Sequence, residues 1–351
     1  MNAEIPIPKT TSRAAACRPQ SMGFTLVEVL VSMVILLMMM LIITQVIGTA
    51  QRTWRQASSR LSQFREARTA FDTITRGLAQ ATINSYRSYD YGGPSGQPTS
   101  ALQFPVGYTR TAELGIKMGP TNSIMTGLGA PNVTPGHAVL FQAPLGYTDD
   151  ANFRTLDRLL CVRGYYVYFS DDVQYLPVGL TGRLESKSRF RLYEYQPTTE
   201  TNMVFASTVS NPDGWTSIPT ESAKANSRPV AENILTLIMA PSFTQASIGG
   251  GAVLLNQASK AESYTFNSYT DANKRYQLPS SIQVVMVAMD EESATRLAQQ
   301  YGNSPPQLFP SRFASPATLS SDLKLVRESL LRQKVNFRIF TSTVTIPAAE
   351  S

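Results

Sequence analysis

A run of apolar residues from Phe24 to Ile43 constrains this chain more than any other feature of its sequence. Leu, Val, Ile and Met fill it almost completely, and its length is about the 20 residues that a helix needs to cross a hydrocarbon layer of roughly 30 Å. Glu28 is the one ionisable side chain between Phe24 and Gly48. Because a charged side chain inside a membrane helix costs roughly 2.5–3.5 kcal/mol on insertion scales, we expect Glu28 to have a function.

A secretory signal peptide is the main competing interpretation of this segment. Such peptides have an apolar core of roughly 7–15 residues followed by a small-x-small cleavage site. The run in this chain is longer, and the residues from Thr44 to Ala50 match such a site poorly. The sequence therefore favours a retained membrane anchor.

The hexapeptide from Gly23 to Glu28, GFTLVE, follows a polar, basic leader and opens the apolar run. In this combination it resembles the processing site of type IV prepilins and of the pseudopilins of type II secretion. The resemblance implies that a prepilin peptidase cleaves after Gly23 and that the new amino terminus, Phe24, is N-methylated. It also implies that Glu28, the fifth residue of the mature chain, acts in subunit assembly.

Electrostatics supports a role of Glu28 in assembly. Cleavage after Gly23 creates a charged α-amino group on Phe24, about one helical turn from Glu28. In a bundle of packed helices, the amino terminus of a neighbouring subunit can approach this carboxylate, and opposite charges attract far more strongly in a low-dielectric medium than in water. The alternative is that Glu28 merely reaches to the membrane interface near the helix end.

The charges that flank the apolar run do not by themselves set its orientation. Three basic residues precede it, Lys9, Arg13 and Arg18, and five follow it closely, Arg52, Arg55, Arg60, Arg65 and Arg68. Under the positive-inside rule this count does not favour a cytoplasmic amino terminus. A single span of the inner membrane, with the C-terminal domain in the periplasm, is therefore implied by the resemblance alone.

Composition leaves room for one sizeable globular domain, or two small ones, beyond the anchor. The chain has 351 residues, of which 42% are hydrophobic and 16% charged. Its formal charge of +6 invites a nucleic-acid interpretation. However, the basic residues concentrate in the leader and just after the apolar run, beside no recognisable nucleic-acid motif, so we expect no nucleic-acid partner and favour a solvated helix face or contact with anionic lipid.

Helical periodicity continues beyond the anchor. Apolar residues recur at spacings of three, four and seven at Trp54, Ala57, Leu61, Phe64, Phe71, Ile74, Leu78 and Ala81. We therefore predict one helix from Phe24 to about Asn84, roughly 90 Å long, that ends near Ser88. This gives four segments: a leader over 1–23, a transmembrane helix over 24–48, an amphipathic extension over 49–90 and a β-rich domain over 91–351.

Strands and loops are predicted for the remainder of the chain. The predicted strands cover 102–106, 138–141, 159–169, 190–195, 234–238, 282–289 and 337–346, and the predicted helices cover 291–301 and 321–334. Two long loops are predicted over 196–229, carrying Trp215, and over 242–278. The fold class is α+β, with a very long N-terminal helix packed on a mainly antiparallel β domain.

Two narrower resemblances are visible. The order of long helix, loops and late strands resembles a minor pseudopilin of the J type, most closely over Leu278 to Val284 and in the final strand. The segments Thr53 to Phe71 and Tyr86 to Tyr91 resemble the cassette protein C family of Verrucomicrobia, whose members carry prepilin-type leaders. Neither resemblance supplies a biochemical activity.

Residues that indicate catalysis are scarce. His137 is the sole histidine, and no nucleophile elbow, zinc-binding helix, P-loop, dinucleotide fingerprint or CxxC pair accompanies it. Cys161 is the only cysteine outside the leader and is expected to be buried. The paired acids at 149–150, 171–172 and 290–292 are expected to be hydrated, or to favour a helix N-terminus at Asp290, rather than to bind calcium. We expect no enzyme, no cofactor and no metal.

The sequence thus predicts a pilin-like structural subunit, and its large loops favour a minor component. Its expected partners are the prepilin peptidase, other pilin-like subunits and an inner-membrane assembly platform. A membrane-tethered binding domain that never polymerises is the first alternative. A secreted hydrolase that uses His137 is a more distant one.

Overall fold

The structure is a computed structural model that describes most of the chain. It describes residues 23, 25–92, 98–100, 103–128, 136–156, 158–173, 177, 179, 183, 186–202, 213–244, 258–259, 263–271, 274–308, 313 and 315–349. The predicted leader before Gly23, and Phe24, lie outside these residues. The chain divides into two compact units, residues 1–57 and 58–351, and each is described by itself.

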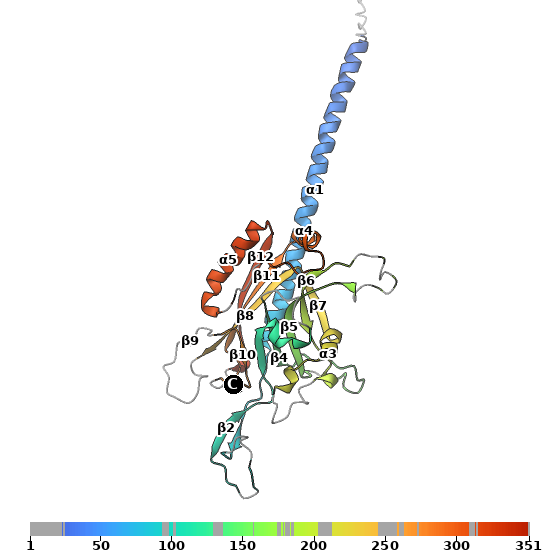
Figure 1. The fold of residues 1–351 in the computed structure, drawn as a ribbon. Coiled ribbons are helices and arrows are strands. Elements are labelled where there is room, and N and C mark those ends of the chain that lie inside the picture. The colour runs from blue at the N-terminus through green and yellow to red at the C-terminus, as the bar shows by residue number, and fades with distance from the viewer. Residues whose placement is uncertain are drawn as a thin grey trace, which may run out of the picture. The chain divides into compact units, whose positions relative to one another are not determined.

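A single long helix, α1, runs from Leu26 to Ala79 and contains the boundary between the two units (Figure 1). Its 54 residues confirm the predicted long N-terminal helix. Its last turn is tightened, because the Gln80 and Ala81 N–H groups bond to the carbonyls of Gly77 and Leu78.

The prediction that this helix reaches Asn84 and ends near Ser88 is wrong. The Asn84 side chain instead donates to Glu113 and accepts from the N–H groups of Glu113 and Leu114. Residues Tyr86–Asp90 form a strand, β1, which pairs with β2, Gly107–Thr111. Tyrosine is enriched in strands, and with Tyr86 to Asp90 paired in a hairpin the amphipathic extension ends at Ala79 rather than at residue 90.

Two further antiparallel sheets build the second unit. One has the order β10-β3-β4-β5-β6-β7 and the other the order β12-β11-β8-β9. The strands of the first are β3 Ile116–Pro120, β4 His137–Ala143, β5 Cys161–Ser170, β6 Arg189–Tyr195, β7 Ser227–Glu232 and β10 Phe266–Asn267. Those of the second are β8 Ile234–Thr244, β9 Ala258–Ser259, β11 Ser281–Met289 and β12 Phe337–Thr345.

One residue joins the two sheets. Asn233 separates β7 from β8 and has a φ of 60°, in the left-handed region that Asn tolerates better than most residues. Its carbonyl accepts from the Met289 N–H, and its side chain donates to Glu291. The chain therefore turns at Asn233 from one sheet into the other.

Short helices complete the unit. They are α2 Thr121–Ile124, α3 Thr220–Ala225, α4 Glu291–Tyr301 and α5 Leu319–Arg332. Asp290 caps α4 by accepting from the Ser293 N–H at 3.0 Å, which agrees with the prediction that this acidic segment favours a helix N-terminus. The predicted bounds of α4 are confirmed, and those of α5 differ by two residues at each end.

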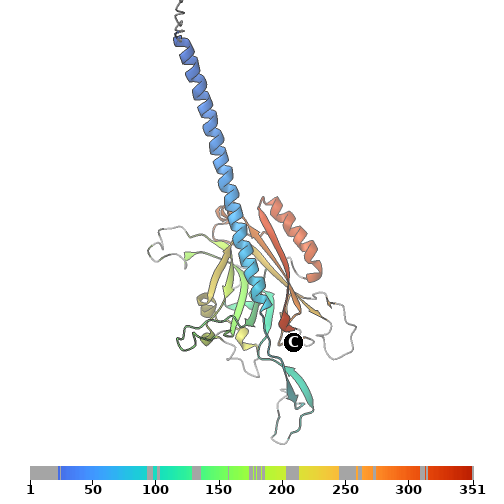
Figure 2. The same cartoon turned by 180° about the vertical axis from the view of Figure 1, so that it is seen from behind.

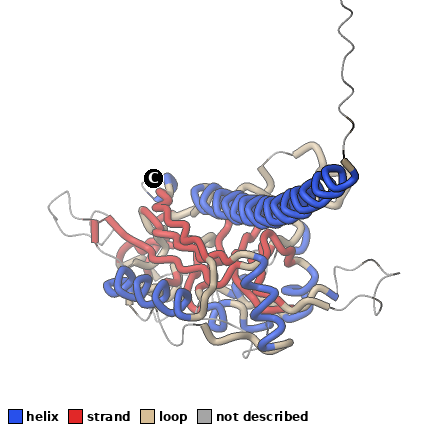
Figure 3. The backbone as a smooth tube through the Cα atoms, turned by 90° about the horizontal axis from the view of Figure 1, so that it is seen from above, coloured by secondary structure: helices blue, strands red, loops and turns tan. Residues whose placement is uncertain are grey.

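The main core lies between the end of α1 and the two sheets. Ala67, Ala70, Phe71, Ile74 and Leu78 are buried on one face of α1 and pack with residues of β4, β5, β8, β11, α4 and α5. Figure 3 shows the strands between the end of α1 on one side and shorter helices on the other. The C-terminal half of α1 is thus an ordinary amphipathic core helix, as its periodicity predicts.

The predicted apolar stripe is wrong at its beginning. Trp54 is 77% exposed and Ala57 is exposed, whereas Phe64 is half-buried and the predicted residues from Phe71 onward are buried. The side chain of Leu61 lies outside the described part.

Most predicted strands are confirmed and two predicted loops need correction. The strands at 138–141, 159–169, 190–195, 234–238, 282–289 and 337–346 correspond to β4, β5, β6, β8, β11 and β12. The strand predicted at 102–106 is wrong: residues 103–106 are irregular and β2 begins at Gly107, while Leu102 lies outside the described residues.

Trp215 was predicted in a surface loop but is 1% exposed. Its Nε1 donates to the Tyr269 hydroxyl at 2.8 Å, and both side chains belong to a second apolar cluster with residues of β4, β5 and β6. Tyr269 and Phe266 lie in the other predicted loop, 242–278, and both are buried, while residues 245–257 lie outside the described part. The central strands need cover on both faces, and these two segments supply part of it.

A glycine allows α1 to approach the sheet closely. A Cβ at Gly77 would lie 2.7 Å from the Tyr165 hydroxyl oxygen and 3.4 Å from two atoms of its ring. Tyr165 is fully buried and donates to Glu194, so its ring has little freedom to move away. Gly77 therefore contributes a close contact that outweighs its poor helix propensity.

We predict that Gly77→Ala lowers the free energy of unfolding by about 1–3 kcal/mol, because the added methyl group overpacks the contact with Tyr165. An exposed site would instead gain about 1 kcal/mol from alanine's helix propensity. Denaturant unfolding of the full chain in detergent micelles measures the effect. Tyr165→Phe removes the clashing oxygen, so Gly77→Ala should cost less in that background, and an equal or larger cost there would contradict the assignment.

Candidate functional site

The N-terminal end of α1 is fixed by a helix cap. The Thr25 Oγ1 accepts from the Glu28 N–H at 3.3 Å, and the Thr25 carbonyl accepts from the N–H groups of Glu28 and Val29. With Thr25 at the N-cap, Glu28 occupies the third helical position, which is the spacing of a capping box. Sequence reasoning missed this arrangement, although the signal T-x-x-E lies within the hexapeptide.

The structure describes two of the three predicted site residues, Gly23 and Glu28. Gly23 is exposed and precedes the helix, and no atom lies within 4 Å of a Cβ built on it. Phe24 lies outside the described residues. Glu28 is exposed in the first turn of α1, and within the described part of the chain its carboxylate has no ion-pair partner. The described chain therefore leaves both Gly23 and the Glu28 carboxylate accessible.

The helix around Glu28 is apolar on all sides. The stretch Leu26–Arg55 has a mean hydropathy of 2.9 over its most apolar 18 residues and is 0% buried there. Every Leu, Val, Ile and Met from Leu26 to Ile47 is at least 45% exposed. This is one N-terminal helix long and apolar enough to span a membrane, which is weakly consistent with a single-pass anchor.

The apolar stretch ends in basic and aromatic residues. Arg52, Trp54 and Arg55 are all exposed in the same turn and a half of α1. Trp side chains prefer the membrane–water interface, where the ring is in contact with lipid and the N–H with water. These residues therefore lie at the C-terminal end of the stretch that is long and apolar enough to span a membrane.

His137 has a structural role. It is 4% exposed on β4, its Nδ1 accepts from the Met239 N–H at 3.2 Å, and its ring lies 4.6 Å from that of Tyr264. Burial lowers the pKa of His137 to about 4, so the ring is neutral near pH 7. Its acceptor nitrogen joins β4 to β8.

Cysteine and acidic side chains are the other groups that could act as a nucleophile or as metal ligands. Cys161 is buried, as predicted, and burial raises the pKa of its thiol. Within the described residues no group of three or more His, Cys, Asp and Glu side chains could hold a metal ion. These residues therefore do not form a redox or metal site in the described part of the chain.

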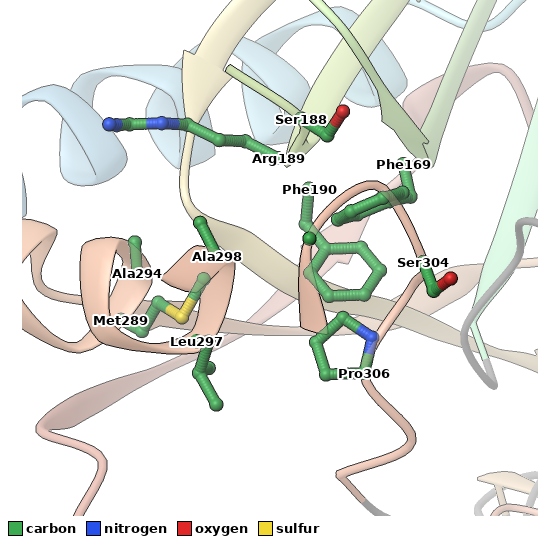
Figure 4. Close-up of a pocket in the computed structure, with 11 residues that line it drawn as sticks. Phe169, Ser188, Arg189, Phe190, Met289, Ala294, Leu297, Ala298, Ser304 and Pro306 are labelled. Atoms are coloured by element: carbon green, nitrogen blue, oxygen red, sulfur yellow. The ribbon is translucent and has the colours of Figure 1, made fainter. Parts of the chain in front are cut away.

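A small hollow beside β6 and α4 was not predicted (Figure 4). It has a volume of about 260 Å³ including space open to solvent, and Phe169, Phe190 and Pro306 line it. Arg189, also in the lining, extends away from the two rings in Figure 4 and forms ion pairs with Glu291 and, at 3.3 Å, with Glu232. The hollow is mostly apolar, and Arg189, the charged side chain in its lining, is already paired with Glu232 of β7 and Glu291 of α4.

The Arg189–Glu291 pair explains the charge state of Glu291. Burial raises the pKa of the Glu291 carboxyl, but hydrogen bonds from Arg189 and Asn233 outweigh this effect and leave the pKa below its ordinary value. The pair connects β6 to the first turn of α4. The pair therefore helps to hold α4 against the sheet that contains β6.

We predict that the domain loses stability on acidification between pH 6.5 and about pH 4 because of His137. In this window the unfolded chain binds a proton at His137 that the native chain excludes, so the free energy of unfolding falls as pH falls, by up to about 3 kcal/mol. Glu291 acts in the same direction only below its ordinary pKa of 4.5. Chemical denaturation at several pH values measures the loss.

His137→Asn is the matched variant, because the Asn Oδ1 can accept from the Met239 N–H without titrating. Its unfolding free energy should change much less between pH 6.5 and 4.5 than that of the parent chain. Parallel pH profiles for the two proteins would show that His137 titrates normally in the folded chain.

Comparison of the chain with models of known protein families, with curated proteins and with solved structures gives no match. The likeness to prepilins therefore rests on the hexapeptide, the apolar helix and the leader of this sequence.

Proposed function

We propose that this protein is a pilin-like structural subunit that a prepilin peptidase cleaves after Gly23 and that assembles through α1. The observation that carries the proposal is an exposed apolar helix whose first turn holds one carboxylate without a partner in the described chain. A partner molecule must then cover the apolar surface and neutralise the charge. Under this proposal Phe24 is N-methylated, the protein resides in the inner membrane with its domain in the periplasm, and an assembly platform extracts it.

Charge and position support the role of Glu28. A cleaved neighbour presents a terminal ammonium group at Phe24, immediately before the Thr25 cap. A carboxylate and an ammonium group attract strongly in hydrocarbon, and each removes the desolvation cost of the other. Pairing between subunits would therefore fix the axial stagger of packed helices, which lipid contacts alone do not specify.

The proposal predicts a defined mature amino terminus. Mass spectrometry of the protein purified from membranes of a host that carries a prepilin peptidase should show a chain that begins with N-methylated Phe24. Gly23→Leu should block cleavage and leave the leader in place. Cleavage near Ala50, or an intact leader on the parent chain in such a host, would refute processing at Gly23.

Two variants of Glu28 separate charge pairing from helix capping. Glu28→Gln keeps a side chain that serves a capping box but removes the charge, whereas Glu28→Ala removes both. Charge pairing predicts that both variants enter assemblies at least about tenfold less than the parent chain, since a factor of ten corresponds to only about 1.4 kcal/mol. Shear fractionation followed by immunoblotting measures incorporation.

The folded domain provides the control, because Glu28 lies in the first unit and the β sheets in the second. Both variants should unfold at the same denaturant concentration as the parent chain. Normal incorporation of Glu28→Gln with poor incorporation of Glu28→Ala would assign Glu28 to capping alone. Normal incorporation of both would refute a role of Glu28 in assembly, and absence of the parent chain from any assembly would favour the alternative of a tethered binding domain that does not polymerise.

A further inference from the structure

The hairpin of β1 and β2 stands apart from the two large sheets. It is a separate two-stranded sheet with Tyr89 opposite Tyr108 and Arg87 opposite Arg110. Figures 1 and 2 show it extending away from the other strands, with β2 labelled in Figure 1. The hydrogen bonds of Asn84 and Tyr86 with Glu113 and Leu114 hold it at its base.

One face of this hairpin carries tyrosine and arginine and is open to solvent. Residues directly opposite each other in an antiparallel pair share a face, as do residues two apart on one strand, so Arg87, Tyr89, Tyr108 and Arg110 lie together. Tyr89 is 54% and Tyr108 70% exposed, and their ring centroids are 5.3 Å apart. This set of four residues is called the hairpin face below.

The two arginines of the hairpin face have no counter-charge in the described chain. Arg87 and Arg110 are exposed and form none of the ion pairs between described residues. The nearby acids are engaged on the opposite face, where Glu113 accepts from Asn84 and Tyr86 and Asp90 accepts from the Gly92 N–H. Like charges directly opposite each other on one face destabilise a strand pair, so an anionic group placed between them would relieve the repulsion.

The hairpin also exposes apolar surface that a stable domain would ordinarily cover. Phe104 is 85% and Val106 73% exposed, just before β2. An isolated two-stranded sheet is only marginally stable in water, and contiguous exposed apolar patches mark interaction sites. Tyr and Arg are the residues that most often anchor protein–protein interfaces.

We propose that the hairpin face receives a segment of a partner protein that carries a carboxylate beside apolar side chains. The carboxylate lies between Arg87 and Arg110, where guanidinium groups bind it bidentately, and the apolar side chains cover Tyr108 and Val106. This proposal does not depend on assembly through α1.

Two other occupants fit the hairpin face less well. Nucleic-acid binding ordinarily uses more cationic side chains than the two arginines of the hairpin face. The exposed side chains of Phe104 and Val106 cannot contact phosphates favourably. A second copy of this chain has a formal charge of +6, so it brings no excess of carboxylates to the arginines. A partner protein with an acidic segment supplies both the charge and the apolar area.

Selection from a phage-displayed library of random 12-residue peptides tests the proposal, with the full chain in detergent micelles as bait. Selected peptides should combine Asp or Glu with aromatic or aliphatic residues. They should bind the Arg87→Gln/Arg110→Gln variant and the Tyr108→Ser variant at least about tenfold more weakly than the parent chain. Replacing their acids by Asn and Gln should weaken binding to a similar degree.

The control variant is Arg327→Gln/Arg332→Gln, which removes two exposed arginines from α5 and should leave peptide binding unchanged. Equal thermal unfolding of all variants shows that the domain is intact. The proposal fails if no peptide is enriched, or if peptides bind the hairpin variants as well as the parent. It also fails if a dT12 oligonucleotide binds the hairpin face more tightly than any peptide, or if sedimentation shows a dimer that the Arg87→Gln/Arg110→Gln variant abolishes.

Discussion

Burial of one face of α1 against the sheets is the contact on which the domain depends. Ala67 and Ala70 are small, so the helix axis lies close to the strands, while Phe71, Ile74 and Leu78 fill the space between the two sheets. Gly77 extends this close approach to the tip of Tyr165. Because one helix face contacts strands of both sheets, loss of this face would uncover both at once, and the domain cannot form its main core without α1.

The first half of the same helix has an apolar surface that the described chain leaves uncovered. From Leu26 to Ile47 apolar side chains point in every direction, and nothing in the described chain covers them. A helix that is apolar all round is stable only in lipid or among other apolar helices. Arg52, Trp54 and Arg55 follow this stretch, and such residues are typical of the boundary between an apolar environment and water. One continuous helix therefore combines a segment long and apolar enough to span a membrane with a core element of the folded domain.

Sequence patterns predicted the elements whose signals are local. The apolar run defined the first half of α1, Asp290 and the acids after it marked the start of α4, and the alternation of Phe337 to Thr345 gave β12.

Prediction failed where contacts distant in the sequence decide the structure. Trp215 is buried because Tyr269, 54 residues away, accepts its N–H, and Asn84 leaves the helix for partners 29 and 30 residues away. Helical periodicity likewise gives no information about the pairing of β1 with β2.

Sequence reasoning singled out Gly23, Phe24 and Glu28 but missed the Thr25 cap, and the capping-box spacing between Thr25 and Glu28 changes how Glu28 is understood. Although a glutamate gains about 0.3–1 kcal/mol from the helix dipole, a glutamine at this position could form the same capping hydrogen bond. It would also avoid most of the cost of an ionised group in hydrocarbon, because a neutral amide is much less expensive to desolvate than a carboxylate. Capping alone therefore favours Gln over Glu at position 28. The carboxylate is the better choice only if a cation meets it, and within the described residues of the chain no cation does. The cation must then come from outside those residues, and the ammonium group exposed by cleavage after Gly23 in a neighbouring subunit is the one that the proposed assembly would bring to that position.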